Sequence, residues 1–249
     1  MQIKNKILEV KNLSCGYKRK QRILKNLNFS LYDDEFLGIV GPNASGKTTL
    51  LKTILGIIKP LEGKIVKNKD IKFGYVPQIF TVDETFPFSV YDILSFAFLK
   101  NFKFKLTKQE KQKIDKILEK FNIKEIKFKL YKDLSGGLKQ KILILRSLLR
   151  EPDVLVLDEP TNDLDIFNTK ISLEFIKNLK KEQKFTVIVV SHSLEIILNY
   201  VERLFVVNNN TIEIINKLED IDLLQNRIKD VFKTNTKIFE VDNWRFIKV

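Results

Sequence analysis

Residues Gly41 to Thr49 read Gly-Pro-Asn-Ala-Ser-Gly-Lys-Thr-Thr, and the rest of the chain is best understood from this segment. The apolar run Phe36 to Val40 precedes it and predicts a buried strand, and the apolar residues from Leu50 to Leu55 predict one face of a helix. Within the stretch, the two glycines, Lys47 and Thr48 match the G-x-x-x-x-G-K-[ST] spacing of a phosphate-binding loop. A plain turn between strand and helix that happens to carry a lysine is the competing interpretation.

Each residue type in this spacing has a physical role. Glycines let the backbone curl so that successive N–H groups point at phosphate oxygens, next to the positive end of the following helix. Lys47 would reach the outer phosphates, and the Thr48 hydroxyl would ligate magnesium. The stretch therefore predicts a binding site for a nucleotide.

The composition limits the class of protein. With 249 residues the chain can bury a large core, and one domain with a subdomain is expected. No apolar run approaches the roughly 18 residues of a membrane span, and Met1 to Val10 contains no secretory signal. Cys15 is the single cysteine, which excludes an internal disulfide and fits a reducing compartment. The net charge of +13 fits a polyanionic partner, but the lysines are spread along the chain, which favours a general compositional bias.

Acidic residues follow a second apolar run. Val154 to Leu157 predicts a buried strand that ends on Asp158 and Glu159. Because ligands of open α/β sheets bind at the carboxyl ends of the strands, paired carboxylates there indicate a cation. Asp158 would hold the metal, usually through water, and Glu159 could polarise an attacking water. The next predicted strand, Thr186 to Val190, leads to His192, the single histidine, at the same edge.

Three further segments are ambiguous when each is taken alone. Tyr17 lies in a predicted basic turn over Gly16 to Gln21, where it could stack on a base or be an ordinary surface tyrosine. Gln78 follows Pro77, which ends a predicted strand over 71–76, so its amide could reach a metal or its water. Ser135-Gly136-Gly137 precedes a predicted helix over 138–150 and offers N–H groups and a hydroxyl to an anion.

The remaining patterns predict the framework around these segments. Strands are expected over 7–13, 23–31 and 63–66, with a hairpin formed by 204–208 and 211–215. Helices dominate residues 88–149, where Ser89 is a candidate N-cap and Thr107 forms a capping box with Glu110. From Glu219 a short helical pattern is followed by alternation over 237–249, for which no function is predicted.

Taken together, these segments resemble the ATPase subunit of an ATP-binding-cassette (ABC) transporter over about residues 7–215. The motifs come in the family's order: the phosphate loop, Gln78, 134–137, 154–160, 161–165 and His192. The resemblance implies an α/β P-loop NTPase fold of the ABC ATPase type, with an antiparallel β subdomain and a helical subdomain at about 79–149. The implied ATPase domain covers 1–218, and 219–249 form a C-terminal tail.

The resemblance also implies cofactors and roles. ATP and Mg²⁺ are the implied cofactors, with Thr48, Gln78 and Asp158 as metal ligands. Glu159 would be the general base, and His192 would contact the γ-phosphate. The implied nucleotide-binding residues are Tyr17, which would stack on adenine, Gly41, Pro42, Asn43, Ala44, Ser45, Gly46, Lys47, Thr48, Thr49, Gln78, Ser135, Gly136, Gly137 and Asp158.

By this resemblance, residues 135–137 would bind the γ-phosphate of an ATP molecule held by a second copy of the chain. The resemblance therefore implies a head-to-tail dimer with two ATP molecules at its interface. Asp165 would lie in the loop that couples the two ATP sites. The chain departs from the family pattern at Leu138, where glutamine usually follows the two glycines. Because leucine cannot hydrogen-bond to a nucleotide, we expect a weaker contact across the dimer.

Family membership would place the protein on the cytoplasmic face of the cell membrane as a peripheral subunit. Its implied partners are an integral membrane permease, a second copy of itself and, in an importer, a substrate-binding protein; no nucleic acid is expected. Residues 82–92 resemble the corresponding stretch in ATPases of zinc and manganese importers, although a turn and a helix cap would explain the same residues. The predicted function is therefore ATP hydrolysis that energises transport, with a divalent metal ion, zinc or manganese, as the imported substrate.

Two alternatives remain: an ABC ATPase that energises transport of another substrate, and a non-transport ABC ATPase that acts on nucleic acid. The coiled-coil chromosome and DNA-repair ATPases carry a long insertion between the phosphate loop and the Ser-Gly-Gly motif, for which the segment between Thr48 and Leu134 is too short. Translation-associated cassette proteins normally carry two cassettes, and this chain has one. A P-loop kinase or GTPase would explain Lys47 but not the Ser-Gly-Gly motif or His192.

Overall fold

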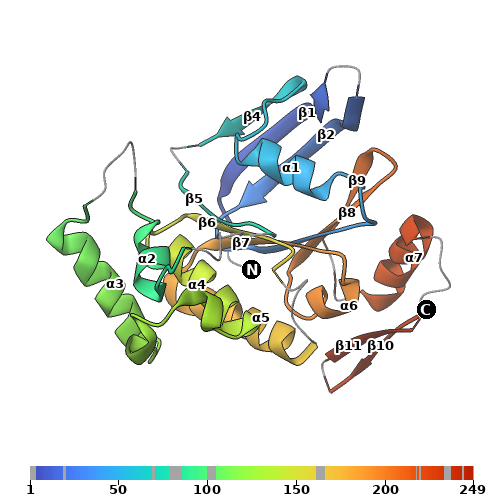
Figure 1. The fold of residues 1–249 in the computed structure, drawn as a ribbon. Helices are drawn as coiled ribbons and strands as arrows, with labels where there is room; N and C mark the ends of the chain where they lie inside the picture. Colours follow the sequence, from blue (N-terminus) through green and yellow to red (C-terminus); the bar gives the residue numbers. More distant parts are fainter. Residues whose placement is uncertain are drawn as a thin grey trace.

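A computed structural model describes residues 4–18, 21–68, 71–78, 86–99, 105–160, 166–216, 218, 220–232, 237–242 and 244–248. Its centre is a six-stranded sheet with the strand order β5-β6-β7-β3-β8-β9 (Figure 1). The first five of these strands are parallel and β9 is antiparallel to β8. The bounds are β3 Phe36–Val40, β5 Phe73–Val76, β6 Val154–Asp158, β7 Thr186–Ser191, β8 Arg203–Asn208 and β9 Thr211–Ile215.

The middle of the sheet is buried on both faces. Every residue of β3, β6 and β7 is buried, as expected for parallel strands whose sequences are nearly continuous apolar runs. Along β3 the side chains alternate between two hydrophobic clusters: Phe36 and Val40 belong to one, and Leu37 and Ile39 to the other. The predicted strands over 36–40 and 154–157 are therefore confirmed, and both deliver their last residues to the same edge of the sheet.

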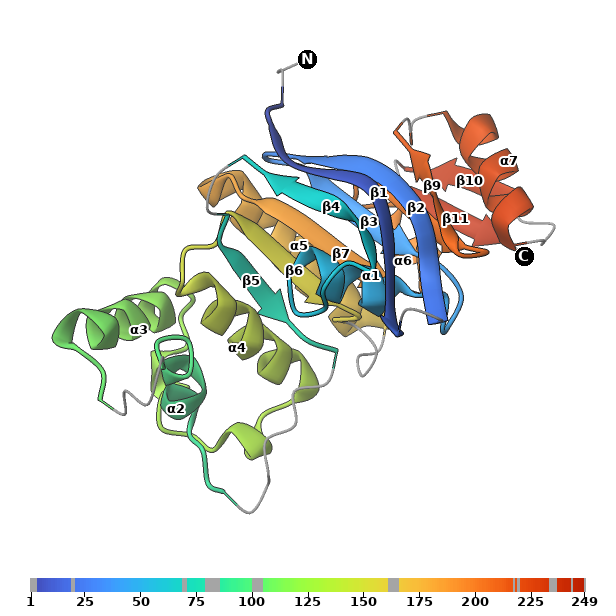
Figure 2. The ribbon, with the colours of Figure 1, turned by 90° about the horizontal axis from the view of Figure 1, so that it is seen from above.

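The second sheet is antiparallel, with the order β2-β1-β4. It contains β1 Lys6–Lys18, β2 Gln21–Tyr32 and β4 Glu62–Lys67. The helix α1, Lys47–Ile54, packs between this sheet and the parallel one, because its buried leucines belong to the same cluster as residues of β1, β2 and β3 (Figure 2).

The predicted basic turn at residues 16–21 is wrong in extent. β1 continues to Lys18 and β2 begins at Gln21, with Gly16 paired to Arg22. A side chain at Gly16 would put its Cβ 2.2 Å from the carbonyl oxygen of Gln21. The glycine is therefore needed for a close approach of two strands rather than for a turn.

The helical part lies to one side of the sheet, next to β5 (Figure 2). Both predicted caps are confirmed: Ser89 begins α2 and Thr107 begins α3, each with a reciprocal capping box. Helix α4 begins two residues earlier than predicted, so the two glycines form its first turn. The helical segments are α2 Val90–Ser95, α3 Lys108–Lys120, the 3₁₀ turns η1 Lys124–Ile126 and η2 Tyr131–Asp133, and α4 Gly136–Leu148.

Helices α4, α5 (Ile166–Gln183) and α6 (Leu194–Ile197) cover the face of the parallel sheet opposite α1 (Figure 1). The C-terminal part forms α7, Ile221–Phe232, and a hairpin of β10 Lys237–Val241 and β11 Trp244–Lys248. Leu224, Ile228 and Ile238 belong to the main hydrophobic cluster, so this part packs onto the same core. Among the described residues, no helix combines the length and apolar character that crossing a membrane requires.

Candidate active site

The phosphate loop connects β3 to α1 and is held by close backbone approaches. Gly46 caps α1 in the left-handed region at φ 105°, and a Cβ there would lie 2.6 Å from Ile23 Cγ2. At Gly41, a Cβ would lie 2.3 Å from the carbonyl oxygen of Val207. Both glycines of the motif are therefore required by the surrounding strands, which fix the path of the loop.

Lys47 is the first residue of α1, and its side chain is buried under this loop. Its Nζ donates hydrogen bonds to the carbonyl oxygens of Gly41, at 2.9 Å, and Pro42, at 3.0 Å. The same Nζ lies 3.8 Å from Oε1 of Glu159. Burial lowers the pKa of Lys47, and the charges of Glu159 and Asp158 oppose that shift. The ammonium group is thus positioned between the loop and the acidic end of β6.

Two carboxylates end β6, as predicted, and both are removed from water. Asp158 is 1% exposed and Glu159 is 9% exposed. Burial raises the pKa of Asp158, while hydrogen bonds from Tyr75 and Thr48 act in the opposite direction. Thr48 Oγ1 donates to Asp158 Oδ1 at 3.4 Å. This edge of the sheet therefore holds concentrated negative charge beside the phosphate loop.

Glu159 is the centre of the cluster. Gln78 Nε2 donates to its Oε2 at 3.0 Å, and Nδ1 of His192 lies 3.7 Å from the same oxygen. Its backbone has a φ of 47°, an uncommon conformation for a residue with a side chain, and its N–H is bonded to the carbonyl of Val190 at 2.9 Å. One carboxylate is thus approached by Gln78, which follows β5, by His192, which follows β7, and by Lys47, which begins α1.

Tyr17 lies beside the phosphate loop, on strand β1 rather than in the predicted turn. It is 62% exposed and lines an open pocket of about 270 Å³ together with Ile23 and residues 44–49. A second pocket of about 640 Å³ adjoins the loop and is lined by Arg22 and by the asparagines at 208–210, among others. The sequence pattern predicts the hairpin that contains these asparagines and assigns no role to Arg22, because no local signal indicates that the β8–β9 hairpin reaches the loop.

The Ser-Gly-Gly segment is separate from this cluster. Ser135 is exposed and caps α4 without a side-chain hydrogen bond, and no described pocket or hydrogen bond joins it to the phosphate loop. Leu138 is partly buried and packs against the main hydrophobic cluster. Asp165 with the rest of 161–165, and residues 82–85, lie outside the described residues.

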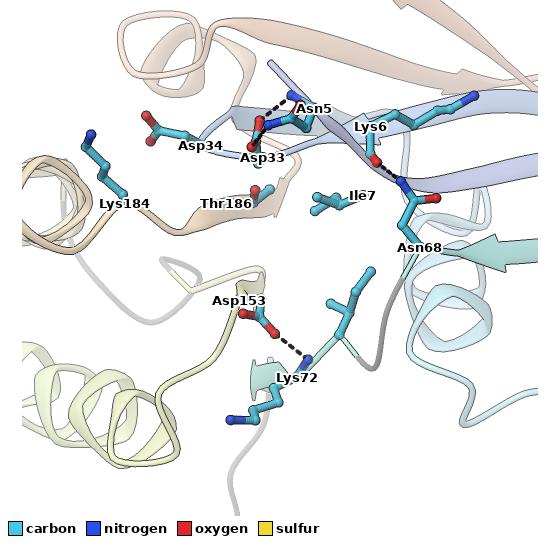
Figure 3. Close-up of a pocket in the computed structure, with 11 residues that line it drawn as sticks. Asn5, Lys6, Ile7, Asp33, Asp34, Asn68, Lys72, Asp153, Lys184 and Thr186 are labelled. Atoms are coloured by element: carbon cyan, nitrogen blue, oxygen red, sulfur yellow. Dashed lines mark hydrogen bonds between the residues drawn. The ribbon is translucent and has the colours of Figure 1, made fainter. Parts of the chain in front are cut away.

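The opposite edge of the parallel sheet also contains a pocket, of about 660 Å³ (Figure 3). Its carboxylates are engaged locally. Asp33 accepts hydrogen bonds from the backbone and side-chain nitrogens of Asn5, and Asp153 accepts one from the backbone of Lys72 at 2.8 Å. None of the predicted site residues lines it.

The geometry of the phosphate-loop edge is that of a site for a phosphorylated ligand, and comparisons with known proteins agree. The sequence profile of the ABC transporter family matches residues 24–162. The chain belongs to the ABC transporter family. This confirms the predicted family, the α/β fold of an ABC ATPase and the enzyme class, an ATP hydrolase that binds nucleotide.

Several relatives within this ABC family are named for zinc. The zinc import ATP-binding protein ZnuC of Acinetobacter baylyi is 34% identical over 194 residues, which cover 78% of this chain and 71% of the relative. The zinc uptake system ATP-binding protein ZurA of Listeria innocua is 34% identical over 220 residues, covering 84% and 85%. Among solved structures, an ABC transporter described as metal-chelate type, in an inward-facing conformation, matches with a TM-score of 0.85 and 29% identity over 98% of this chain and 96% of that one.

Proposed function

We propose that this chain is the nucleotide-binding subunit that energises import of a divalent metal ion, zinc or manganese, through a membrane permease. The observation that carries the ATPase part is the convergence of Lys47, Gln78 and His192 on the buried carboxylate of Glu159. The metal substrate is supported by the relatives named as zinc import and zinc uptake ATPases.

The residues at this edge fit a magnesium ion. Thr48, Gln78 and Asp158 offer a hydroxyl, an amide and a carboxylate oxygen, which are the hard oxygen ligands that Mg²⁺ prefers. No cluster of three or more His, Cys, Asp or Glu side chains suited to a metal occurs among the described residues, which fits an ion held partly by the phosphates of its nucleotide. The ion would neutralise charge on the phosphates during hydrolysis.

The remaining functions, nucleotide binding and catalysis, would be carried out by separate groups of residues. Backbone N–H groups of the phosphate loop and Lys47 hold the phosphates, and Tyr17 stacks on the adenine beside the loop. Glu159, desolvated and facing the loop, takes the proton of the attacking water, and His192 contacts the γ-phosphate. The amide nitrogen of Gln78 donates to Glu159, which leaves its amide oxygen as the atom that would hold the metal or its water.

Residues 135–137 would act on the nucleotide of a second copy. Ser135 is exposed and makes no side-chain capping hydrogen bond at the start of α4, which supports a contact made across a dimer. A dimeric ATP-binding cassette bound to ADP and Pi is among the similar solved structures, with a TM-score of 0.67 and 25% identity over 83% of this chain and 97% of that one. ATP would close the dimer and hydrolysis would open it.

The helical part would receive the permease on the cytoplasmic side of the membrane. Phe86 is 57% exposed and Phe128 is 75% exposed, so apolar rings are available on this part of the surface. A substrate-binding protein would deliver the metal to the permease from the other side. In this account residues 1–218 form the ATPase domain, with about 79–149 as the docking subdomain.

The test is co-purification of the tagged chain from its own cells, combined with uptake of radioactive zinc and manganese in a deletion strain. We expect a multi-span membrane protein to accompany the chain, and the strain to lose zinc or manganese uptake. Recovery of nucleic acid without a permease, and with normal uptake, would replace the transporter proposal by an ATPase that acts on nucleic acid. Recovery of a permease with normal uptake of both metals would show that the transported substrate is something else.

A further inference from the structure

Tyr75 occupies a position between the carboxylate of β6 and the helix that begins at the Ser-Gly-Gly segment. It lies on β5, three residues before Gln78, and β5 pairs in parallel with β6. Its hydroxyl donates a hydrogen bond to Asp158 Oδ2 at 3.2 Å, and its backbone carbonyl accepts one from Ser147 of α4 at 3.2 Å. The backbone of Tyr75 is therefore fixed by α4, and its hydroxyl is hydrogen-bonded to the carboxylate of Asp158.

The two oxygens of Asp158 have different neighbours. Tyr75 bonds Oδ2, while Oδ1 accepts from Thr48 Oγ1 at 3.4 Å. Thr48 is the residue whose hydroxyl would ligate magnesium, so Oδ1 is the oxygen on the metal side. A hydrogen bond to the other oxygen fixes the rotation of the carboxylate about its last bond, which decides where Oδ1 points.

The chemistry of a tyrosine suits this position. Burial raises the pKa of Tyr75 well above its usual range, and the negative charge of Asp158 raises it further. An ordinary tyrosine already keeps its phenolic proton at neutral pH, so the hydroxyl can donate to the carboxylate as the 3.2 Å geometry indicates. A phenylalanine of the same shape would fill the same space and leave Oδ2 of a nearly inaccessible carboxylate without that donor.

We propose that Tyr75 is a positioning residue that orients the Asp158 carboxylate for Mg²⁺ by holding Oδ2 and leaving Oδ1 beside Thr48. The inference rests on the proposed role of Mg²⁺ at this site. Removal of a residue that hydrogen-bonds to a metal ligand typically lowers metal affinity by about 10–100-fold, although that residue does not touch the metal.

The test measures binding of a fluorescent ATP analogue to the full chain, first in EDTA and then with increasing Mg²⁺. In Tyr75→Phe we expect the Mg²⁺ concentration for half-maximal enhancement of binding to rise roughly tenfold. Binding in EDTA should stay within about twofold of wild type, because the ring and the phosphate loop are unchanged. Tyr200→Phe is the matched control, since it removes another partly buried hydroxyl, bonded to the backbone of Lys170 at 3.5 Å, and should alter neither value.

Two results would overturn the inference while leaving the proposed function intact. One is a Mg²⁺ requirement in Tyr75→Phe equal to that of wild type, which would show that Asp158 is oriented without the hydroxyl. The other is an equal loss of binding with and without Mg²⁺, which would show that Tyr75 acts on the fold of the loop. If wild-type binding does not respond to Mg²⁺ at all, the proposed metal site fails and this inference fails with it.

Discussion

Strand β6 has a carboxylate before its first residue and two at its end, and the two ends behave differently. Asp153, before the strand, is exposed, and its carboxylate caps the backbone N–H of Lys72. Asp158 and Glu159, at the other end, are almost inaccessible and face the phosphate loop. The same residue types thus serve the fold at one end and concentrate desolvated charge at the other. Position relative to the loop, rather than composition, decides which carboxylates can do chemistry.

The pockets at the two edges of the sheet repeat this contrast. The pocket at the amino ends of the strands, of about 660 Å³, is about as large as the larger of the two beside the phosphate loop, of about 640 Å³, and charged groups surround it (Figure 3). Two of its aspartates, Asp33 and Asp153, accept hydrogen bonds from backbone N–H groups, and the third, Asp34, is paired with Lys180. At the other edge, Lys47 and Gln78 approach a single buried carboxylate. Pocket size alone would not have separated the two edges.

The largest effect on ATP turnover is expected from removing the negative charge of Glu159, at the end of β6 that faces the phosphate loop. Glu159→Gln should reduce ATP turnover by roughly 100-fold or more, because a general base contributes about 10²–10⁴ to the rate. ATP binding should persist, since the phosphate loop is untouched. Asp153→Asn makes the same chemical change at the other end of β6 and should leave turnover within about twofold of wild type. Steady-state ATPase assays of both variants check this, and equal losses in the two would remove the distinction between the ends.

A smaller effect is expected at Leu138, where the chain lacks the usual glutamine. Leu138→Gln, made together with Glu159→Gln to prevent turnover, should strengthen the ATP-dependent dimer by roughly three- to tenfold, the value of one hydrogen bond. Sedimentation with ATP measures the dimer.

Leu138→Ala in the same background removes the packing of the leucine without adding an amide, so it should not strengthen the dimer. A dimer equally strong with leucine and glutamine would show that residue 138 does not reach the partner's nucleotide.

The smallest effect is a change in stability that depends on pH. Burial raises the pKa of Asp158 in the folded protein, so the folded state binds the proton of this carboxyl group more tightly than the unfolded state. The stabilisation by this protonated group is complete at low pH and is lost as the pH rises through the pKa of the folded state. Without nucleotide, Asp158→Asn should therefore raise the melting temperature at neutral pH by a few degrees, corresponding to about 1 kcal/mol, and the difference should shrink toward acid pH. Thermal melts across this range provide the measurement. A lower melting temperature of the variant at neutral pH would show that the neighbours of Asp158 already offset its burial.

Much of the fold was predictable because its signals are local. The apolar runs of β3 and β6 and the capping boxes at Ser89 and Thr107 each lie within a few residues, and the structure has all four where predicted. The turn at Gly16 was predicted wrongly because a glycine needed for the approach of a paired strand looks, in sequence, like a glycine needed for a turn.

Contacts between distant segments were not predictable in detail. The bonds from Tyr75 to Asp158 and from Gln78 to Glu159 depend on β5 lying beside β6 in a particular register, which joins residues about eighty positions apart. The sequence pattern predicts Gln78 near a metal but assigns no role to Tyr75, because a tyrosine in a predicted strand is ordinary in the core of a protein. The pocket lined by Arg22 requires the β8–β9 hairpin to reach the phosphate loop, which no local pattern specifies.

Hydrogen–deuterium exchange of the wild-type chain, with and without Mg-ATP, would show directly whether nucleotide binds at the carboxyl edge of the parallel sheet. We expect slower exchange over 41–49 and around Gln78 and Glu159, because nucleotide would order the backbone at that edge. Exchange at 33–34 and at Asp153, on the other edge of the sheet, should not change. Protection at the amino edge, with none at the phosphate loop, would show that nucleotide does not bind at the carboxyl edge.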